Sequence, residues 1–161
     1  MKKLILLFLG ITVSAAIFAQ EKTSDSKANN DIPKFKIMNI VDSSKFTDES
    51  LQKNKKTIII YFGADCGHCT YFTKKMMDSL SLFQNTQIVM VSSSEYNHIQ
   101  KFAEDNKLAS CPFITVGRDG DYFFISHYEI RMFPTAIVYN KKGKYVKRFE
   151  SEMSISELVS D

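Results

Sequence analysis

The hydrophobic pattern divides the middle of the chain into alternating strands and helices. Two short runs, within residues 58–62 and 87–92, are almost continuously apolar, and such runs are typical of strands that are covered on both faces. Between them, apolar side chains recur at spacings of three and four, which predicts an amphipathic helix; they are Cys69, Phe72, Met76, Leu80 and Phe83. The first strand therefore leads directly into a helix.

The residues around these runs predict further short elements. Residues 34–41 alternate between apolar and polar and predict a strand, with Phe35, Ile37 and Val41 on one side. Thr47 can cap a short helix that ends near Asn54. Residues 92–95 (Ser-Ser-Ser-Glu) match a capping box and predict a helix whose apolar stripe is Ile99, Phe102 and Ala103. Residues 122–125 fit either a strand or a helix.

The last third of the chain predicts strands that are joined by turns. Residues 111–116 are predicted to form a short strand, followed by a turn at residues 117–120. Residues 135–140 and 144–149 are predicted to form a hairpin, and Ser154 begins a capping box for a short closing helix. The order of these elements predicts an α/β fold in which helices flank a central mixed sheet.

The N-terminal residues predict export from the cytoplasm. Residues 1–19 resemble a secretory signal peptide, with a charged start at Lys2-Lys3, an apolar stretch over residues 4–18 and a cleavage point near Ala19-Gln20. That stretch is shorter than the roughly 20 residues that span a bilayer, although an uncleaved anchor is an alternative. We expect a periplasmic location, and no stable membrane insertion of the mature form.

Length predicts a single domain, and net charge argues against a nucleic-acid-binding protein. The polar residues 20–32 are predicted to form a disordered tether, and residues 33–161 are of one domain's length. Removing residues 1–19 deletes two lysines and no acid, so the formal net charge falls from +3 to +1. Nucleic-acid binders need a concentrated basic surface, so we expect no nucleic-acid partner.

The candidate chemistry lies where the first buried strand turns into a helix, at Cys66-Gly67-His68-Cys69. The N-terminus of a helix carries unpaired N–H groups and a partial positive charge, which stabilise a thiolate, the reactive form of cysteine. Cys66 would lie at the exposed helix mouth and act as the nucleophile, and Cys69 would lie deeper and resolve the mixed disulfide. His68 favours the thiolate, whereas the carboxylate of Asp65 opposes it.

The cysteines and histidines also allow other interpretations. A zinc site would need a second pair of ligands that the sequence lacks, so no metal or organic cofactor is expected. A disulfide with a purely structural role would constrain very little chain. Cys111 is an odd thiol and therefore a candidate reactive group, but its place in an apolar run favours a buried strand residue. His98 is interpreted as a solvated histidine.

The segment Tyr61–Cys69 resembles the active-site strand, turn and helix of the thioredoxin-like superfamily. Residues 128–143, which include Phe133-Pro134, resemble that family's cis-proline segment and the hairpin after it. The resemblance implies a three-layer sandwich in which Pro134 faces the cysteines and the peptide at Phe133 binds an extended client segment. Cys69 and Pro134 are 65 residues apart. That gap resembles the periplasmic TlpA-like branch, which carries an extra helix and strand at this place.

The sequence departs from the family pattern in three respects. Asp65 stands where a tryptophan usually precedes the first cysteine, and Ile60 aligns with the buried acid that moves protons near the second. The dipeptide Gly67-His68 resembles disulfide isomerases rather than reductases. These differences leave the direction of electron flow open.

The leading hypothesis is a thiol–disulfide oxidoreductase that acts on client proteins with thiols or disulfides and needs a separate redox partner. We expect a monomer. Phe62, Tyr71 and Phe133 are candidates for apolar contact with clients, and burial in the core is an equal alternative for them. The competing hypothesis is a non-catalytic adaptor or chaperone, or a metal-handling protein that holds copper or zinc with Cys66, Cys69 and His68. A peroxidatic threonine-and-cysteine pattern is not evident.

Overall fold

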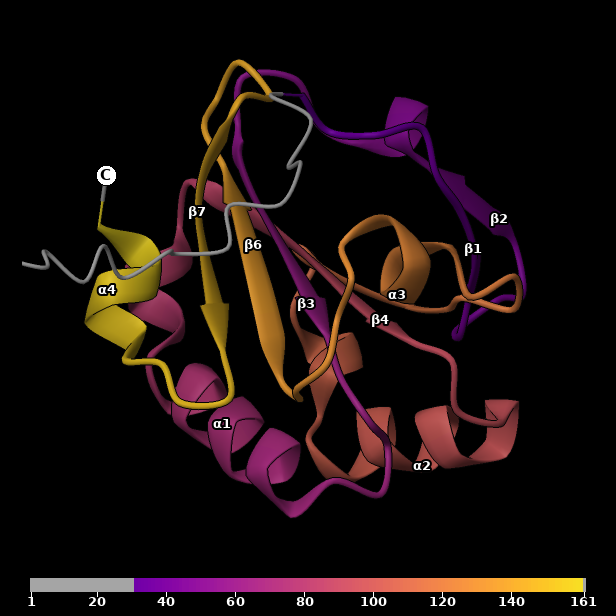
Figure 1. Cartoon of the computed structure of the whole chain (residues 1–161). Coiled ribbons are helices and arrows are strands. Elements are labelled where there is room, and N and C mark those ends of the chain that lie inside the picture. The colour runs from indigo at the N-terminus through magenta and orange to yellow at the C-terminus, as the bar shows by residue number, and fades with distance from the viewer. Residues whose placement is uncertain (1–30, 161) are drawn as a thin grey trace, which may run out of the picture.

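A seven-stranded mixed sheet runs through the middle of the computed structural model, which describes residues 31–160 (Figure 1). The strand order is β2-β1-β5-β4-β3-β6-β7. The three central strands β3, β4 and β5 are parallel to one another, and the remaining neighbours pair antiparallel. The strand bounds are β1 Lys36–Asn39, β2 Lys45–Thr47, β3 Lys56–Tyr61, β4 Thr86–Ser92, β5 Ile114–Arg118, β6 Thr135–Tyr139 and β7 Tyr145–Glu150.

The two predicted apolar runs form the central strands β3 and β4, in which every residue is buried. Helices cover both faces of the sheet, with bounds α1 Gly67–Asp78, α2 Tyr96–Asp105, α3 Phe123–His127 and α4 Ile155–Val159. Ile58 and Ile60 point into a core shared with α1, α2 and α4, whereas Ile59 and Tyr61 point into a second core shared with α3. The predicted three-layer α/β sandwich is therefore confirmed.

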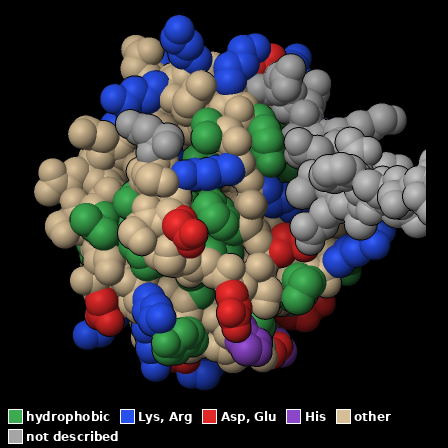
Figure 2. Space-filling view, turned by 60° about the vertical axis from the view of Figure 1, so that its left-hand side comes forward, with side chains coloured by type: hydrophobic (Ala, Val, Ile, Leu, Met, Phe, Trp, Pro, Cys, Tyr) green, Lys and Arg blue, Asp and Glu red, His purple; other side chains and the backbone are tan. Residues whose placement is uncertain are grey.

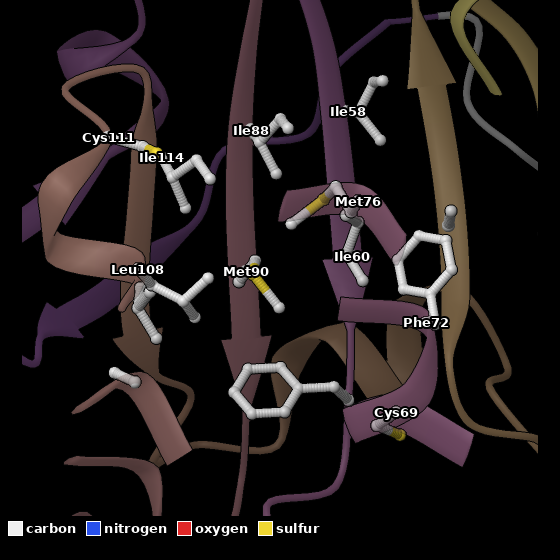
Figure 3. Packing of buried hydrophobic residues seen from close by; sticks show 14 of the residues in the cluster. Ile58, Ile60, Cys69, Phe72, Met76, Ile88, Met90, Leu108, Cys111 and Ile114 are labelled. Carbon is white, nitrogen blue, oxygen red and sulfur yellow. The ribbon is translucent and has the colours of Figure 1, made fainter. Parts of the chain in front are cut away.

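Helix α1 lies over β3 and carries the predicted amphipathic pattern. Its buried residues are Cys69, Phe72, Thr73 and Met76. Figure 3 shows the side chains of Phe72 and Met76 beside Ile58 and Ile60, with Cys69 at the lower end of the same cluster. Burying one large apolar side chain contributes about 1.5–3 kcal/mol, so this face fixes the position of the helix that begins at the cysteine pair.

Helix α2 and strand β5 form the predicted insertion between the cysteine helix and the strand that follows Pro134. Strand β5 extends the sheet by pairing parallel to β4, and β1 then pairs with its other edge. The predicted apolar stripe of α2, Ile99, Phe102 and Ala103, is buried in the same core as α1. The insertion therefore places a second helix beside α1.

Several predicted boundaries of helices and strands are wrong. Ser92 continues β4 instead of capping α2, which begins at Tyr96 without a side-chain cap, and the Ser92 hydroxyl accepts the N–H of Ser94. The helix expected after Thr47 is a single 3₁₀ turn, Asp48–Ser50, preceded by the unpredicted strand β2. Val41 lies outside β1 and is 72% exposed.

The C-terminal elements follow the predictions more closely. The ambiguous residues 122–125 belong mainly to helix α3, and β6 and β7 form the predicted hairpin. Ser154 accepts the N–H of Glu157 and caps α4 as predicted. Strand β5 begins after Cys111 and includes Gly117, so residue 111 is buried but not in a strand, and the turn comes later than predicted.

The predicted signal peptide and most of the predicted tether lie outside the described residues. Asp31 and Ile32 are described, and both contact the hairpin: Asp31 pairs with the Lys144 ammonium at 2.5 Å, and the N–H of Ile32 donates to the Gly143 carbonyl at 3.0 Å. Two residues of the predicted tether therefore contact the folded domain. Within residues 31–160, no helix has the length and apolar character needed to cross a bilayer.

The two ends of the sheet differ in what they carry. The turn that joins β6 and β7 lies at the upper end in Figure 1, where Asp31 pairs with Lys144, whereas the first turn of α1 lies at the lower end. Basic side chains gather along the upper edge of the face shown in Figure 2, and lower on that face they are interspersed with acidic ones. The lower end, where α1 begins, is the candidate site.

Candidate functional site

The cysteine pair lies where β3 leads into α1. Cys66 is the N-cap residue of α1 and has an extended backbone, with φ −93° and ψ 114°. Its sulfur accepts the N–H of Cys69 at 3.2 Å and is joined to the Cys69 sulfur in a disulfide, with 5.2 Å between the two Cα atoms. One of the unpaired N–H groups of the first helical turn is thus directed at the Cys66 sulfur.

The two cysteines differ in their access to solvent. Cys66 is partly buried and is flanked by exposed residues at Asp65, Gly67 and His68, whereas Cys69 has no exposed surface. Cys69 belongs to the inward stripe of α1, because it lies three residues before Phe72. A protein that approaches this end of the molecule therefore meets Cys66 and not Cys69.

The loop before β6 reaches the cysteine pair through the pairing of β6 with β3. The register places Thr135 opposite Tyr61, so Pro134 lies where the chain leaves β3 toward Cys66. The Phe133–Pro134 peptide bond is cis, as the family resemblance implies. A Cβ atom on Gly63 would lie 3.2 Å from Cys66 Cβ and 3.4 Å from the Phe133 ring. Cys66 and Phe133 therefore both lie so close to Gly63 that a side chain there would displace its neighbours by a few tenths of an ångström.

Several hydrogen bonds and a ring contact hold this loop. The Thr135 hydroxyl donates to the Met132 carbonyl at 2.6 Å, and the N–H of Ser151 donates to the Pro134 carbonyl at 2.8 Å. Beneath it, the ring of Tyr61 lies 5.7 Å from that of Phe133. Burial raises the pKa of Tyr61 to about 12, so this ring stays neutral under the site.

Of the three aromatic candidates for client contact, the structure brings one to the cysteines at the surface. Phe133 is 38% exposed, and its neighbour Met132, which the sequence did not single out, is 50% exposed. Phe62 is 1% exposed and packs against Phe102 with 4.5 Å between ring centroids, so of its two alternatives burial in the core is the one that holds. Tyr71 is exposed on α1, with the Lys75 ammonium 4.5 Å from its ring.

The charged residues at the site have different partners. The side chain of Asp65 is 80% exposed, and its carboxylate accepts a hydrogen bond from Nδ1 of His98 at 3.1 Å. His98 was expected to be merely solvated, so the sequence missed this contact. Residues 65 and 98 are distant in the chain and meet only because α2 packs beside α1. His68 is exposed and lies on the opposite side of α1.

Two grooves run along α1 from the cysteine end. One, of about 500 Å³, separates α1 from the loop between β7 and α4, and its lining includes His68, Tyr71, Lys75, Glu152 and Met153. The other, of about 580 Å³, separates α1 from α2, and its lining includes Asp65, Thr70, Lys74, His98 and Lys101. The first turn of α1 is thus open to solvent on both sides.

The remaining candidates are apart from this site or form no cluster with it. Cys111 is a buried free thiol beside Ile114, at the other side of the core cluster from Cys69 (Figure 3). Ile60, at the position of the family's buried acid, is a fully buried aliphatic residue. Within residues 31–160, no three histidine, cysteine or acidic side chains are arranged to hold a metal ion.

Comparisons with known proteins identify relatives of this chain. A family model described as a thioredoxin-like domain matches residues 45–160. No curated protein matches. Among solved structures, the chain is similar to a secreted Mycobacterium tuberculosis disulfide oxidoreductase that is homologous to Escherichia coli DsbE, with 17% identity, a TM-score of 0.65 and coverage of 78% of this chain and 91% of the other.

Two further structures show the breadth of chemistry on this fold. A putative thiol:disulfide interchange protein DsbE from Chlorobium tepidum is 16% identical, with a TM-score of 0.63 and coverage of 80% and 87% of the two chains. The peroxidoxin BcpB from M. tuberculosis is 14% identical, with a TM-score of 0.67 and coverage of 80% and 91%. At these identities the structures establish the fold and leave the chemistry to the residues of the site.

Proposed function

Because the chain belongs to the thioredoxin-like domain family, we propose that it is an exported thiol–disulfide oxidoreductase that exchanges disulfides with client proteins through Cys66 and Cys69. One observation carries the proposal. A disulfide-bonded pair at the start of α1, beside the loop of Phe133 and Pro134, joins a partly buried cysteine to one with no exposed surface. That difference in exposure supports Cys66 as the attacking residue and Cys69 as the resolving residue.

In the reducing direction, the Cys66 thiolate attacks one sulfur of a client disulfide. The bond between Cys66 and that sulfur forms, the client disulfide breaks, and the other client sulfur leaves as a thiolate that takes a proton from solvent. Cys69 then loses its proton and attacks the Cys66 sulfur, which forms the Cys66–Cys69 disulfide and releases the second client thiolate. Two electrons pass from the pair to the client. The oxidising direction runs the same steps in reverse, and a second redox protein restores the pair.

The start of α1 supplies the electrostatic part of this chemistry. The N–H of Cys69 donates to the Cys66 sulfur, and hydrogen bonds to a charged acceptor are stronger than those to a neutral one. The N-terminal charge of α1 acts in the same direction, as does protonated His68. The carboxylate of Asp65 opposes them, so the thiol pKa of Cys66 reflects a balance between these groups.

The loop before β6 is the proposed client-binding element. The exposed side chains of Met132 and Phe133 offer apolar contact at the lower end of the molecule, and the peptide at Phe133 would pair with an extended client segment. Pro134 is itself buried, so its role in this proposal is to shape the loop. The apolar patch is small, as expected for brief contact with many different clients.

Export is part of the proposal. The predicted signal peptide over residues 1–19 supports it, and the similar M. tuberculosis oxidoreductase is described as secreted. Oxidising compartments outside the cytoplasm are where disulfide exchange serves newly exported proteins. Fractionation of cells that express the full chain tests this point: we expect a chain shortened by about 19 residues outside the cytoplasm.

The test of the activity compares single cysteine variants in insulin reduction with dithiothreitol or reduced glutathione. Cys66→Ser should abolish turnover, and Cys69→Ser should retain the first attack but accumulate a mixed disulfide that non-reducing electrophoresis reveals. Cys111→Ser is the matched control and should keep full activity. Full activity of Cys66→Ser would refute the proposal. So would equal amounts of mixed disulfide in Cys69→Ser, which keeps Cys66, and in Cys66→Ser, which keeps Cys69.

A further inference from the structure

Helix α2 of the insertion reaches the residue that precedes the attacking cysteine. His98, in the first turn of α2, donates from Nδ1 to the carboxylate of Asp65 at 3.1 Å. Asp65 is directly before Cys66 in the chain, in the loop that leads into α1. The insertion thus brings an ionisable side chain onto the acid that stands beside the reactive sulfur.

Several other charged groups near this pair have partners of their own. One turn along α2, Lys101 pairs with Asp105 at 2.9 Å, and Glu95, directly before α2, pairs with Arg118 at 3.6 Å. Lys74, from α1, lines the same groove. Within residues 31–160, His98 is the one side chain that makes a hydrogen bond or an ion pair with the carboxylate of Asp65.

The position of the carboxylate gives this contact a consequence for the sulfur. A negative charge beside Cys66 disfavours the thiolate, because a second negative charge would form close by. A donor on the carboxylate draws part of that charge away, and a protonated imidazole cancels it within the pair. Because His98 comes from α2, the strength of this effect depends on how the insertion packs against α1.

We propose that His98 is a positioning residue that holds the Asp65 carboxylate and offsets its charge, so that the Cys66 thiolate forms more readily. The proposal rests on the assignment of Cys66 as the attacking sulfur. The insertion then contributes to the active site, because α2 carries the histidine that binds Asp65. Asp65 is the residue at the position where the family usually has a tryptophan. His98 itself touches neither the client nor the reacting sulfurs.

The test measures the thiolate of Cys66 directly. In a Cys69→Ser, Cys111→Ser background, the rate of alkylation by iodoacetamide is followed from about pH 4 to about pH 9, and the midpoint is the pKa of the Cys66 thiol. We expect His98→Asn to raise this midpoint by about half a pH unit, the size typical of a solvent-exposed charge pair. Asp65→Asn should lower it.

The double variant decides between a specific pair and a general effect. In an Asp65→Asn background, His98→Asn should leave the midpoint unchanged, because the charge that it offsets is gone. Lys101→Gln is the matched control, since it removes a cation one turn along the same helix and should shift the midpoint less than His98→Asn does. The proposal is overturned if His98→Asn does not shift the midpoint. It is also overturned if His98→Asn shifts the midpoint equally in the Asp65→Asn background, or if Lys101→Gln produces a shift of the same size.

This experiment separates the inference from the proposed function. Alkylation needs no client and no turnover, so the coupling between residues 65, 66 and 98 is measured even if insulin is not a substrate. A Cys66→Ser protein that still reduces insulin would overturn the proposed function without touching the coupling. Conversely, loss of the coupling leaves the exchange reaction at Cys66 intact.

Discussion

Substituting Gly117 by alanine tests how closely the inserted strand β5 approaches β1. A Cβ at position 117 would lie 2.5 Å from Ile37 Cδ1, 2.9 Å from Ile37 Cγ1 and 3.1 Å from the Met38 carbonyl oxygen. Ordinary carbon–carbon contacts are about 3.5–4.0 Å, so the new methyl group overlaps the isoleucine by about 1 Å. Ile37 is 2% exposed and lies in the core beneath α3, which limits how far it can move.

The expected cost follows from this overlap. Overpacking of a core by one methyl group costs typically about 1–3 kcal/mol, and the preference of a strand for alanine over glycine offsets about 0.5–1 kcal/mol of it. We expect Gly117→Ala to lower the free energy of unfolding by about 1–2 kcal/mol and Tm by about 4–8 °C in a domain of this size. Urea unfolding followed by circular dichroism measures the former, and a thermal scan measures the latter.

Two comparisons make this prediction specific. Gly120→Ala is the matched control: the nearest atom to its Cβ is 3.8 Å away, so its stability should stay within about 0.5 kcal/mol of the wild type. Ile37→Val removes the atom that is closest to position 117, so it should cost less in the Gly117→Ala background than alone. If Gly117→Ala and Gly120→Ala are equally stable, the register of β1 against β5 is wrong.

Three further predictions concern the loop, the closing helix and the response to pH. Phe133→Ser should raise KM for insulin several-fold with little loss of stability, because the ring is partly exposed. Tyr122→Ser is the control, since it removes another exposed aromatic ring. Equal effects of the two substitutions on KM would contradict the client-binding role of Phe133. Lys56→Met should lower the free energy of unfolding by about 1–3 kcal/mol, because the buried ammonium donates to the carbonyls of Val159 and Ser160 at the end of α4; an unchanged urea midpoint would contradict this. Burial lowers the pKa of His127, so the unfolded chain binds its proton more readily, and stability should fall as pH drops below about 6.5, the ordinary histidine value. His127→Gln should flatten this fall in Tm between about pH 7 and pH 5, and a slope equal to that of the wild type would contradict the assignment.

The central elements were predictable because their signals are local. The apolar runs of β3 and β4 and the spacing of Cys69, Phe72 and Met76 determine two buried strands and a one-sided helix. The cysteine pair falls at their junction, so its place at the start of α1 follows from the chain alone. The cis bond before Pro134 came from the family resemblance, since the isomer of a peptide bond leaves no trace in composition or periodicity.

The errors share a different physical origin. Ser92 is of a residue type that often caps helices, but it lies in β4 and pairs with Arg118 of β5. Strand β2 is a short edge strand that is held in place by pairing with β1. The contact between Asp65 and His98 joins two separate elements, and no local pattern encodes the packing of α2 beside α1. For Phe62 the sequence left client contact and core burial open, and only the packing against Phe102 decides for the core.

In the proposed exchange reaction, the complete burial of Cys69 affects which thiols can compete to release a client from Cys66. Small thiols dissolved around the protein can approach a client linked to Cys66, but they act at whatever concentration the surroundings supply. Cys69 is anchored one turn away, with 5.2 Å between the Cα atoms, so the fold itself sets its local concentration. The rate at which Cys69 resolves a mixed disulfide at Cys66 is therefore set by the protein itself. At the same time, burial protects Cys69 from thiols and oxidants in the surrounding solution.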